Sequence, residues 1–174
     1  MSDVILALDI STKSYYTVEV LFCTEWRRPM EKQMNVEMKR MNYLANEIDG
    51  AYHEAALKLG LSDSGMMILY AICNNGDTCL LNDITRLSGI RKQTINSALR
   101  KLENEGIVYL ENFSGRKKKV CLTDKGKKLA KDTVIRIIAI ENEILTSWTE
   151  AELGLYIELT ERYLSLFKEK IKEL

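Results

Sequence analysis

The sequence predicts a mainly α-helical fold with a small β-hairpin, and three observations carry this prediction. The 174 residues contain only one proline and nine glycines, so few positions interrupt a helix. Apolar residues near both ends of the chain recur at alternating steps of four and three, which is the spacing of one face of a helix. Between these ends, two short β-prone runs flank a basic turn.

Charge is unevenly distributed along the chain. The sequence is 46% apolar and 29% charged, which is typical of a globular protein, and its net charge is zero. Between Leu80 and Lys125, however, ten basic residues stand against five acidic ones, so this segment carries +5 and the rest of the chain −5. A basic segment inside a neutral chain predicts a local surface for an anionic partner.

The residue inventory argues against an enzyme, a metal site, a cofactor or a membrane protein. The four cysteines (Cys23, Cys73, Cys79 and Cys121) form no CxxC pair, and His53 is the single histidine. The sequence has no Gly-rich phosphate loop, HExxH motif or nucleophile elbow. No apolar run approaches the ~18 residues of a membrane span, and no secretory signal is present. We therefore expect a cytoplasmic protein whose thiols are small core residues.

The N-terminal part predicts a hairpin followed by a long helix. Two β-prone runs, VILALDI and YYTVEVLF, form the expected hairpin, and Pro29 closes the segment. The helix that follows ends at Gly60. Its apolar stripe repeats every ~3.5 residues, as in a coiled coil. The stripe comprises Met34, Met38, Met41, Ala45, Ile48, Tyr52, Ala55 and Leu59.

Three shorter helices are expected next. The first, SDSGMMILYAICNNG, begins with Ser62 or Asp63 as its cap and stops at Asn75-Gly76. The second is LLNDITRLSG, and Gly89 separates it from the third, which lies in GIRKQTINSALRKLENEGIV. The apolar spacing buries one face of the last two helices where they cross, through Ile84, Leu87, Ile90, Ile95, Leu99 and Leu102.

Two strands and two helices complete the expected order. IVYLENF and KKVCLT are expected strands, joined by a basic turn from Ser114 to Lys117. Thr123 then caps a long helix that runs to about Trp148. The last helix again carries a 3.5-residue stripe of Leu153, Ile157, Thr160, Leu164, Phe167, Ile171 and Leu174. The two stripes can pack on each other or on a second chain, and we favour a homodimer.

Three short helices followed by a hairpin is the order of a winged helix-turn-helix. The second helix of this motif is expected to expose Arg91, Lys92, Gln93, Thr94, Asn96, Ser97 and Arg100. Such side chains can pair with base edges in the major groove of double-stranded DNA. The basic turn adds Arg116, Lys117 and Lys118 for the backbone or the minor groove. Two alternatives stay open: a solvated helix face, and a winged-helix module that binds an acidic protein partner.

Three stretches match the pattern of one family. LSDSGMMILYAI, LNDITRLSGIRKQTINSALRKLENEGIV and GRKKKVCLTDKG resemble the second helix, the helix-turn-helix and the wing of the multiple-antibiotic-resistance regulator (MarR) family. The resemblance runs from about Met34 to the C-terminus, and its most specific piece is the Leu-Thr-x-x-Gly run that ends at Gly126. The sequence departs from the pattern at Thr85 (usually alanine), Arg91 (usually a capping serine) and Ser114 (usually aspartate).

The resemblance implies a dimeric transcriptional regulator, expected to be a ligand-responsive repressor of a near-palindromic operator. Family members bind small aromatic or anionic effectors between the dimer helices and the DNA-binding lobe, or oxidise a cysteine. Cys23 lies where redox members keep their thiol, but the surrounding VLFCTEW does not match their pattern. The candidate pocket residues are Tyr43, Met66, Met67 and Tyr70, for which core packing is the alternative.

The same comparison divides the chain into four expected parts. Residues 1–29 are an N-terminal extension of unknown role, and residues 30–61 are a first dimerisation helix. Residues 62–125 are a winged helix-turn-helix lobe for DNA, and residues 126–174 are C-terminal dimerisation helices.

Overall fold

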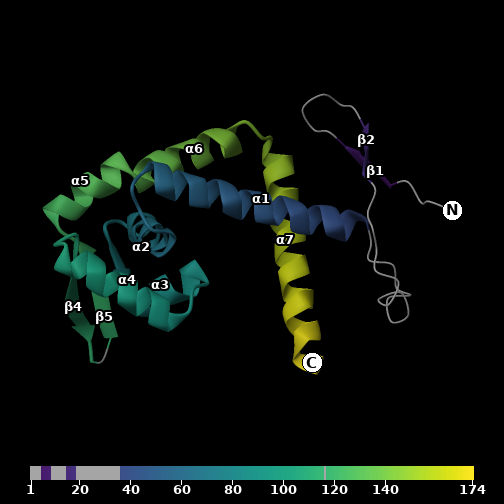
Figure 1. Ribbon diagram of the computed structural model, residues 1–174. Coiled ribbons are helices and arrows are strands. Elements are labelled where there is room, and N and C mark those ends of the chain that lie inside the picture. The colour runs from purple at the N-terminus through teal and green to yellow at the C-terminus, as the bar shows by residue number, and fades with distance from the viewer. Residues whose placement is uncertain (1–4, 9–14, 19–35, 116) are drawn as a thin grey trace. The chain divides into compact units, whose positions relative to one another are not determined.

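A computed structural model describes residues 5–8, 15–18, 36–115 and 117–174 (Figure 1). The chain divides into two compact units, Met1–Ile48 and Asp49–Leu174. Several positions singled out in the sequence lie outside the described residues, namely Cys23, Pro29, Met34 and Arg116.

The first unit contains the N-terminal hairpin and the start of the first long helix. β1 (Ile5–Leu8) pairs antiparallel with β2 (Tyr15–Val18), so the predicted hairpin is confirmed. α1 (Val36–Lys58) continues into the second unit. The helix ends where predicted, because Gly60 has a φ of 70°, which glycine adopts without a steric penalty.

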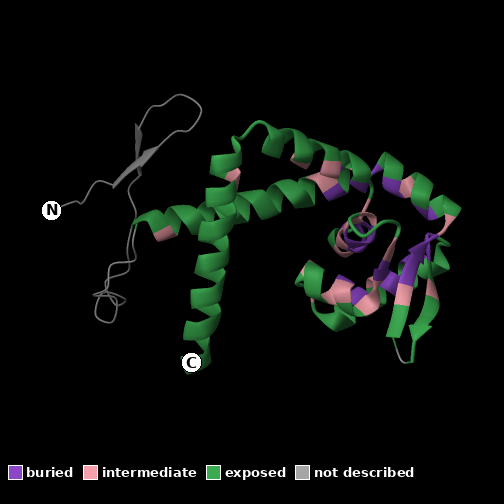
Figure 2. Ribbon diagram, turned by 180° about the vertical axis from the view of Figure 1, so that it is seen from behind, coloured by how far each residue is buried: buried purple, intermediate pink, exposed green. Residues whose placement is uncertain are grey.

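The second unit is organised around α2 (Asp63–Cys73). Ser62, rather than Asp63, is its cap, and the Ser62 side chain accepts a hydrogen bond from the Gly65 N–H at 3.2 Å. Six residues of α2 are buried, and the helix packs against α3 (Leu81–Ser88), α4 (Lys92–Asn104) and α6 (Val134–Thr146). Figure 2 shows the buried positions gathered on α2, α4 and the adjoining sheet.

The sheet has three antiparallel strands, one more than the sequence predicted. β4 (Val108–Ser114) and β5 (Lys117–Leu122) form the expected hairpin. β3 (Thr78–Leu80) pairs with the other edge of β5, so the order is β3-β5-β4. Three residues are too few to show an alternating pattern, and the pairing is made by residues about 40 positions away, from Thr78 to Cys121.

The expected helix from Thr123 to Trp148 is two helices. Thr123 caps α5 (Asp124–Asp132) as predicted, but the chain breaks at Thr133 before α6 begins. Thr133 has φ −126° and ψ −92°, and its hydroxyl donates to the Leu129 carbonyl at 2.6 Å. A threonine hydroxyl that bonds back to the preceding turn competes with the helical backbone. Because Thr133 and Val134 are both buried, packing holds this break in place.

The predicted core of the helix-turn-helix is confirmed except at one residue. Ile84, Ile95, Leu99 and Leu102 are buried, and Ile90 is partly buried against them. Leu87 was expected in this core but is 49% exposed. Periodicity identifies the inward side of a helix but not how far neighbouring elements cover it, and on the eight-residue α3 only Ile84 is fully covered.

The last helix, α7 (Glu150–Lys170), has no buried residue. It begins with a capping box in which Thr149 and Glu152 satisfy each other's backbone N–H groups. Many large apolar side chains lie exposed along it: Leu155, Tyr156, Ile157, Leu159, Tyr163, Leu164, Leu166 and Phe167. A short 3-10 turn, Ile171–Glu173, follows.

No single helix in the described part of the chain is long and apolar enough to cross a membrane. α1 and α2 meet the requirement of length and composition only as a pair, and they bend by 92° at their junction. Most of α2 is buried in the protein core.

Candidate nucleic-acid interface

The turn between α3 and α4 sets the direction of the exposed face of α4. Gly89 has a φ of 64°, the left-handed conformation that the sequence predicted at this point. Ser88 supports the turn, because its hydroxyl oxygen accepts from the Ile90 N–H at 3.3 Å. The chain then enters α4 through Arg91, whose side chain makes no capping hydrogen bond, as expected from an arginine at this position.

α4 separates its residues cleanly into two faces. Ile95, Leu99 and Leu102 are buried against the core. All seven residues predicted for base and phosphate contacts are exposed: Arg91, Lys92, Gln93, Thr94, Asn96, Ser97 and Arg100. The Ser97 hydroxyl donates to the Gln93 carbonyl at 3.1 Å, so it must rotate before it can donate to a phosphate.

The wing is the tip of the β4–β5 hairpin. Gly115 has a φ of 56°, which lets the chain reverse there. Lys117 and Lys118, which the sequence predicted as contacts, are both exposed, and Lys119 is partly buried.

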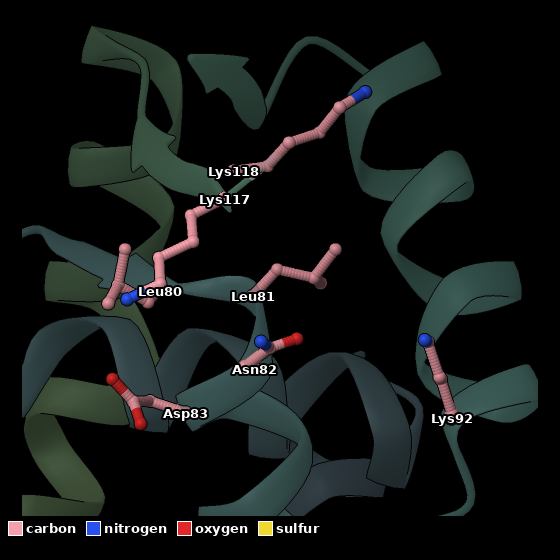
Figure 3. Close-up of a pocket in the computed structure, with 7 residues that line it drawn as sticks. All are labelled: Leu80, Leu81, Asn82, Asp83, Lys92, Lys117 and Lys118. Atoms are coloured by element: carbon pink, nitrogen blue, oxygen red, sulfur yellow. The ribbon is translucent and has the colours of Figure 1, made fainter. Parts of the chain in front are cut away.

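A lysine-lined hollow of about 360 Å³ lies between the start of α4 and the wing. Figure 3 shows Lys92 on one side of it and Lys117 and Lys118 on the other. Three lysines line this hollow, and its acidic residue, Asp83, already pairs with Arg86 at 3.3 Å. Such a concentration of cations suits an anionic group.

A second hollow of similar volume adjoins the first along α4. It shares Lys92 and Lys118 with the first hollow and adds Asn96 and Arg100. The structure thus brings five predicted contact residues of α4 and the wing into one continuous surface. Asn82 also lines the first hollow, and the sequence analysis did not predict it. Its position in the first turn of the short α3 was the signal that could have identified it.

Thr94 and Ser97 lie apart from that surface. They line a different hollow, of about 430 Å³, between α4 and the beginning of α2, together with Ser62, Ser64 and Lys101. Five predicted contact residues of α4 therefore form two groups, with Lys92, Asn96 and Arg100 beside the wing and Thr94 and Ser97 beside α2.

A close contact at Gly126 locks α5 to the segment between α4 and the wing. A Cβ atom at Gly126 would lie 2.0 Å from the Ile107 carbonyl oxygen, so no other residue fits without a shift of the backbone. Thr123 completes the junction, because its hydroxyl donates to the Gly106 carbonyl at 2.7 Å and accepts from the Gly126 N–H at 3.0 Å. The Leu-Thr-x-x-Gly run is thus a joint that fixes where the wing begins.

Three of the four residues predicted for an effector pocket lie in the second unit, and their surroundings differ. Met66 is 3% exposed and belongs to the core, which agrees with the packing alternative. Met67 and Tyr70 line a hollow of about 300 Å³ together with Arg86 and Leu87. Tyr43 is exposed on the part of α1 that belongs to the first unit.

A carboxylate that the sequence analysis did not predict connects three helices through hydrogen bonds. Glu141 on α6 accepts hydrogen bonds from the hydroxyls of Tyr52 on α1 and Tyr70 on α2. Burial, and then the bonds to Glu141, raise the pKa of both tyrosines, so both remain donors at neutral pH. The available signal was the position of Glu141, four residues after Ile137 and therefore on the same side of the helix as this buried residue.

The thiols and carboxylates of the described residues suggest no further chemistry. Cys79 and Cys121 are free and buried, as expected, and Cys73 is partly buried. Burial raises the pKa of the Cys73 thiol to about 11, so it is a weak nucleophile at neutral pH. No group of three or more histidine, cysteine, aspartate or glutamate residues in the described ranges could hold a metal ion.

Comparison with known proteins agrees with this geometry. A model of the MarR family matches residues 59–118, which run from the end of α1 to the wing. Among curated proteins, none matches the sequence.

Solved structures share the fold at low sequence identity. A MarR family regulator from Neisseria meningitidis is 16% identical with a TM-score of 0.71, over 80% of this chain and 99% of that one. The MepR–DNA complex of S. aureus is 19% identical with a TM-score of 0.56, over 77% and 99%. BpsR of Bordetella bronchiseptica, whose DNA binding is regulated by 6-hydroxynicotinic acid, is 18% identical with a TM-score of 0.53, over 71% and 98%. Residues 59–118 therefore match the MarR family in sequence, and the chain has the fold of MarR family winged helix-turn-helix regulators.

Proposed function

We propose that the protein is a dimeric, sequence-specific DNA-binding transcriptional regulator that acts in the cytoplasm. The observation that carries the proposal is the continuous surface of Lys92, Asn96, Arg100, Lys117 and Lys118 between α4 and the wing. This surface combines side chains that can hydrogen-bond to base edges with cations that can bind the phosphate backbone. Two proteins of similar structure, MepR and BpsR, bind DNA.

In this proposal, α4 lies in the major groove and the wing lies on the backbone or in the minor groove. Asn96 and Gln93 are placed to pair with adenine, and Arg100 with guanine. Thr94 and Ser97, in the hollow beside α2, face a neighbouring phosphate. Two subunits related by a two-fold axis then read half-sites one turn, ~34 Å, apart, so the operator is near-palindromic.

The exposed apolar side chains of the long helices support the homodimer. We assign residues 30–61 and 126–174 to dimerisation and residues 62–125 to the DNA-binding lobe. α7 exposes apolar side chains along its whole length and buries none, and a solvated helix of this composition is unstable without a partner.

We further propose that the regulator is a repressor released by a small effector. The hollow lined by Met67, Tyr70, Arg86 and Leu87 supports this step, because it offers an aromatic ring, a flexible thioether and a guanidinium group. An aromatic acid fits that combination. Glu141 binds the hydroxyl of Tyr70 and so links the hollow to α1 and α6.

The test is selection of binding sites from random DNA in the presence of heparin. The proposal expects one enriched site with a dyad, bound by a dimer. A protein that heparin displaces from every sequence alike, with no site enriched, has no sequence-specific DNA function. The basic face would then be that of a module for an acidic protein partner.

A further inference from the structure

Phe113 stands out on the wing because it is a large aromatic residue in a basic hairpin. Its side chain is 59% exposed, and it lies two residues before the turn glycine Gly115. A single exposed apolar side chain is common on protein surfaces and says little alone. Its position at the tip, however, follows from a specific distortion of the strand.

A β-bulge places Phe113 outside the strand pairing. Asn112 pairs with Lys118 and Ser114 with Lys117, so Phe113 is an extra residue that faces no partner on β5. Bulges bend a strand and redirect a side chain, and they are common beside functional sites. β4 is also an edge strand of the described sheet, so no further strand of that sheet pairs with its outer edge.

One cation lies beside the ring, and two more lie on the same hairpin. The Lys119 ammonium lies 5.9 Å from the centre of the Phe113 ring, and Lys117 and Lys118 are exposed on the same hairpin. An apolar tip with a cationic rim complements a groove that has phosphates along its edges and bases or sugars at its floor. The minor groove has this arrangement, and proteins that enter it often insert an apolar wedge.

We propose that Phe113 is an apolar wedge that the wing inserts into the DNA minor groove, while the lysines around it hold the flanking phosphates. The proposal rests on the proposed DNA-binding function and adds to it an apolar contact between the wing and the DNA. It predicts that the wing contributes to affinity in two separable ways. Removing a lysine lowers the dependence of binding on salt, whereas removing the ring lowers affinity and leaves that dependence unchanged.

The experiment compares variants of the full-length protein on the selected operator at several salt concentrations. Phe113→Ala should weaken binding about 10-fold for each wing at unchanged salt slope, and Phe113→Leu should retain most of the affinity. Tyr109→Ala is the matched control, because Tyr109 lies on the same strand, is 43% exposed and is four residues farther from the tip. It should bind as the unmodified protein does.

A second readout reports the wedge directly. A 2-aminopurine base placed where the wing meets the minor groove should brighten when the unmodified protein binds and unstacks it, and should stay dim with Phe113→Ala. Equal affinity of Phe113→Ala and the unmodified protein, while Lys117→Ala lowers the salt slope, would overturn the wedge and leave the DNA-binding function standing. Equal losses in Phe113→Ala and Tyr109→Ala would also overturn it. Failure of the unmodified protein to bind DNA would instead overturn the proposed function itself.

Discussion

Replacing Gly126 by alanine tests whether α5 is locked against the segment that starts the wing. The new Cβ atom would lie 2.0 Å from the Ile107 carbonyl oxygen and 3.1 Å from its carbonyl carbon. Such atoms do not approach within 3.0 Å, so the backbone must move by about 1 Å. The Ile107 oxygen also accepts from the Thr123 N–H at 3.0 Å and from its hydroxyl at 3.2 Å, and the movement weakens both bonds.

The expected loss of stability combines three contributions. Overpacking costs about 1–3 kcal/mol, and weakening of the hydrogen bonds costs about 1 kcal/mol. Alanine returns about 1 kcal/mol through its better helix propensity. The free energy of unfolding should therefore fall by about 1–3 kcal/mol, which lowers the Tm of a chain of this length by roughly 3–10 °C.

Thermal unfolding followed by circular dichroism measures this change. The matched control is Gly50→Ala in the middle of α1, where no heavy atom lies within 4 Å of the position of the added Cβ atom. This control should melt about 1–3 °C higher than the unmodified protein, because only the helix propensity changes. The steric argument is refuted if Gly126→Ala is as stable as the unmodified protein while Gly50→Ala shows its expected rise.

Three further predictions concern the dimer, the tyrosine–glutamate cluster and the base contacts. Leu164→Asp, in the middle of the α7 stripe, should give monomers or aggregates by light scattering, whereas Ser165→Asp beside the stripe should stay dimeric. Glu141→Gln leaves one tyrosine hydroxyl without its acceptor and should lower the free energy of unfolding by about 1 kcal/mol; an unchanged urea midpoint contradicts the role of this cluster. Gln93→Ala and Asn96→Ala should each cost about 1–3 kcal/mol on the preferred site and relax its sequence at particular base pairs. Equal losses on random DNA would show that neither side chain reads bases.

The sequence predicted the helix-turn-helix well because local signals and burial agree there. Gly89 is in the left-handed conformation, Ser62 and Thr123 cap their helices, and Ile95 and Leu99 are buried. Each of these depends on a residue type at a short, regular spacing.

The features that the sequence did not predict depend on contacts between residues that are far apart in the chain. The break at Thr133 has no proline or glycine to signal it and is held by burial of the neighbouring side chains. β3 exists because β5 pairs with it, and Leu87 is half exposed because the described chain covers only part of that side of α3. For the site, the exposed face of α4 follows from periodicity, whereas the hollow between Lys92 and Lys118 requires the placement of the wing. The contacts of α4 and the wing with DNA remain predictions.

The salt dependence of operator binding tests the central claim most directly, because it counts the phosphate contacts of the wing. Each lost contact should lower the slope of log K against log salt by ~0.9, and a dimer loses two with each substitution. Arg116→Ala should weaken binding to all sequences, flatten the slope by about 1–2 and leave the preferred site unchanged. Lys117→Ala should do the same more weakly, because lysine lacks the bidentate grip of arginine. If both variants titrate like the unmodified protein at two salt concentrations, the wing does not contact DNA and the central claim is wrong.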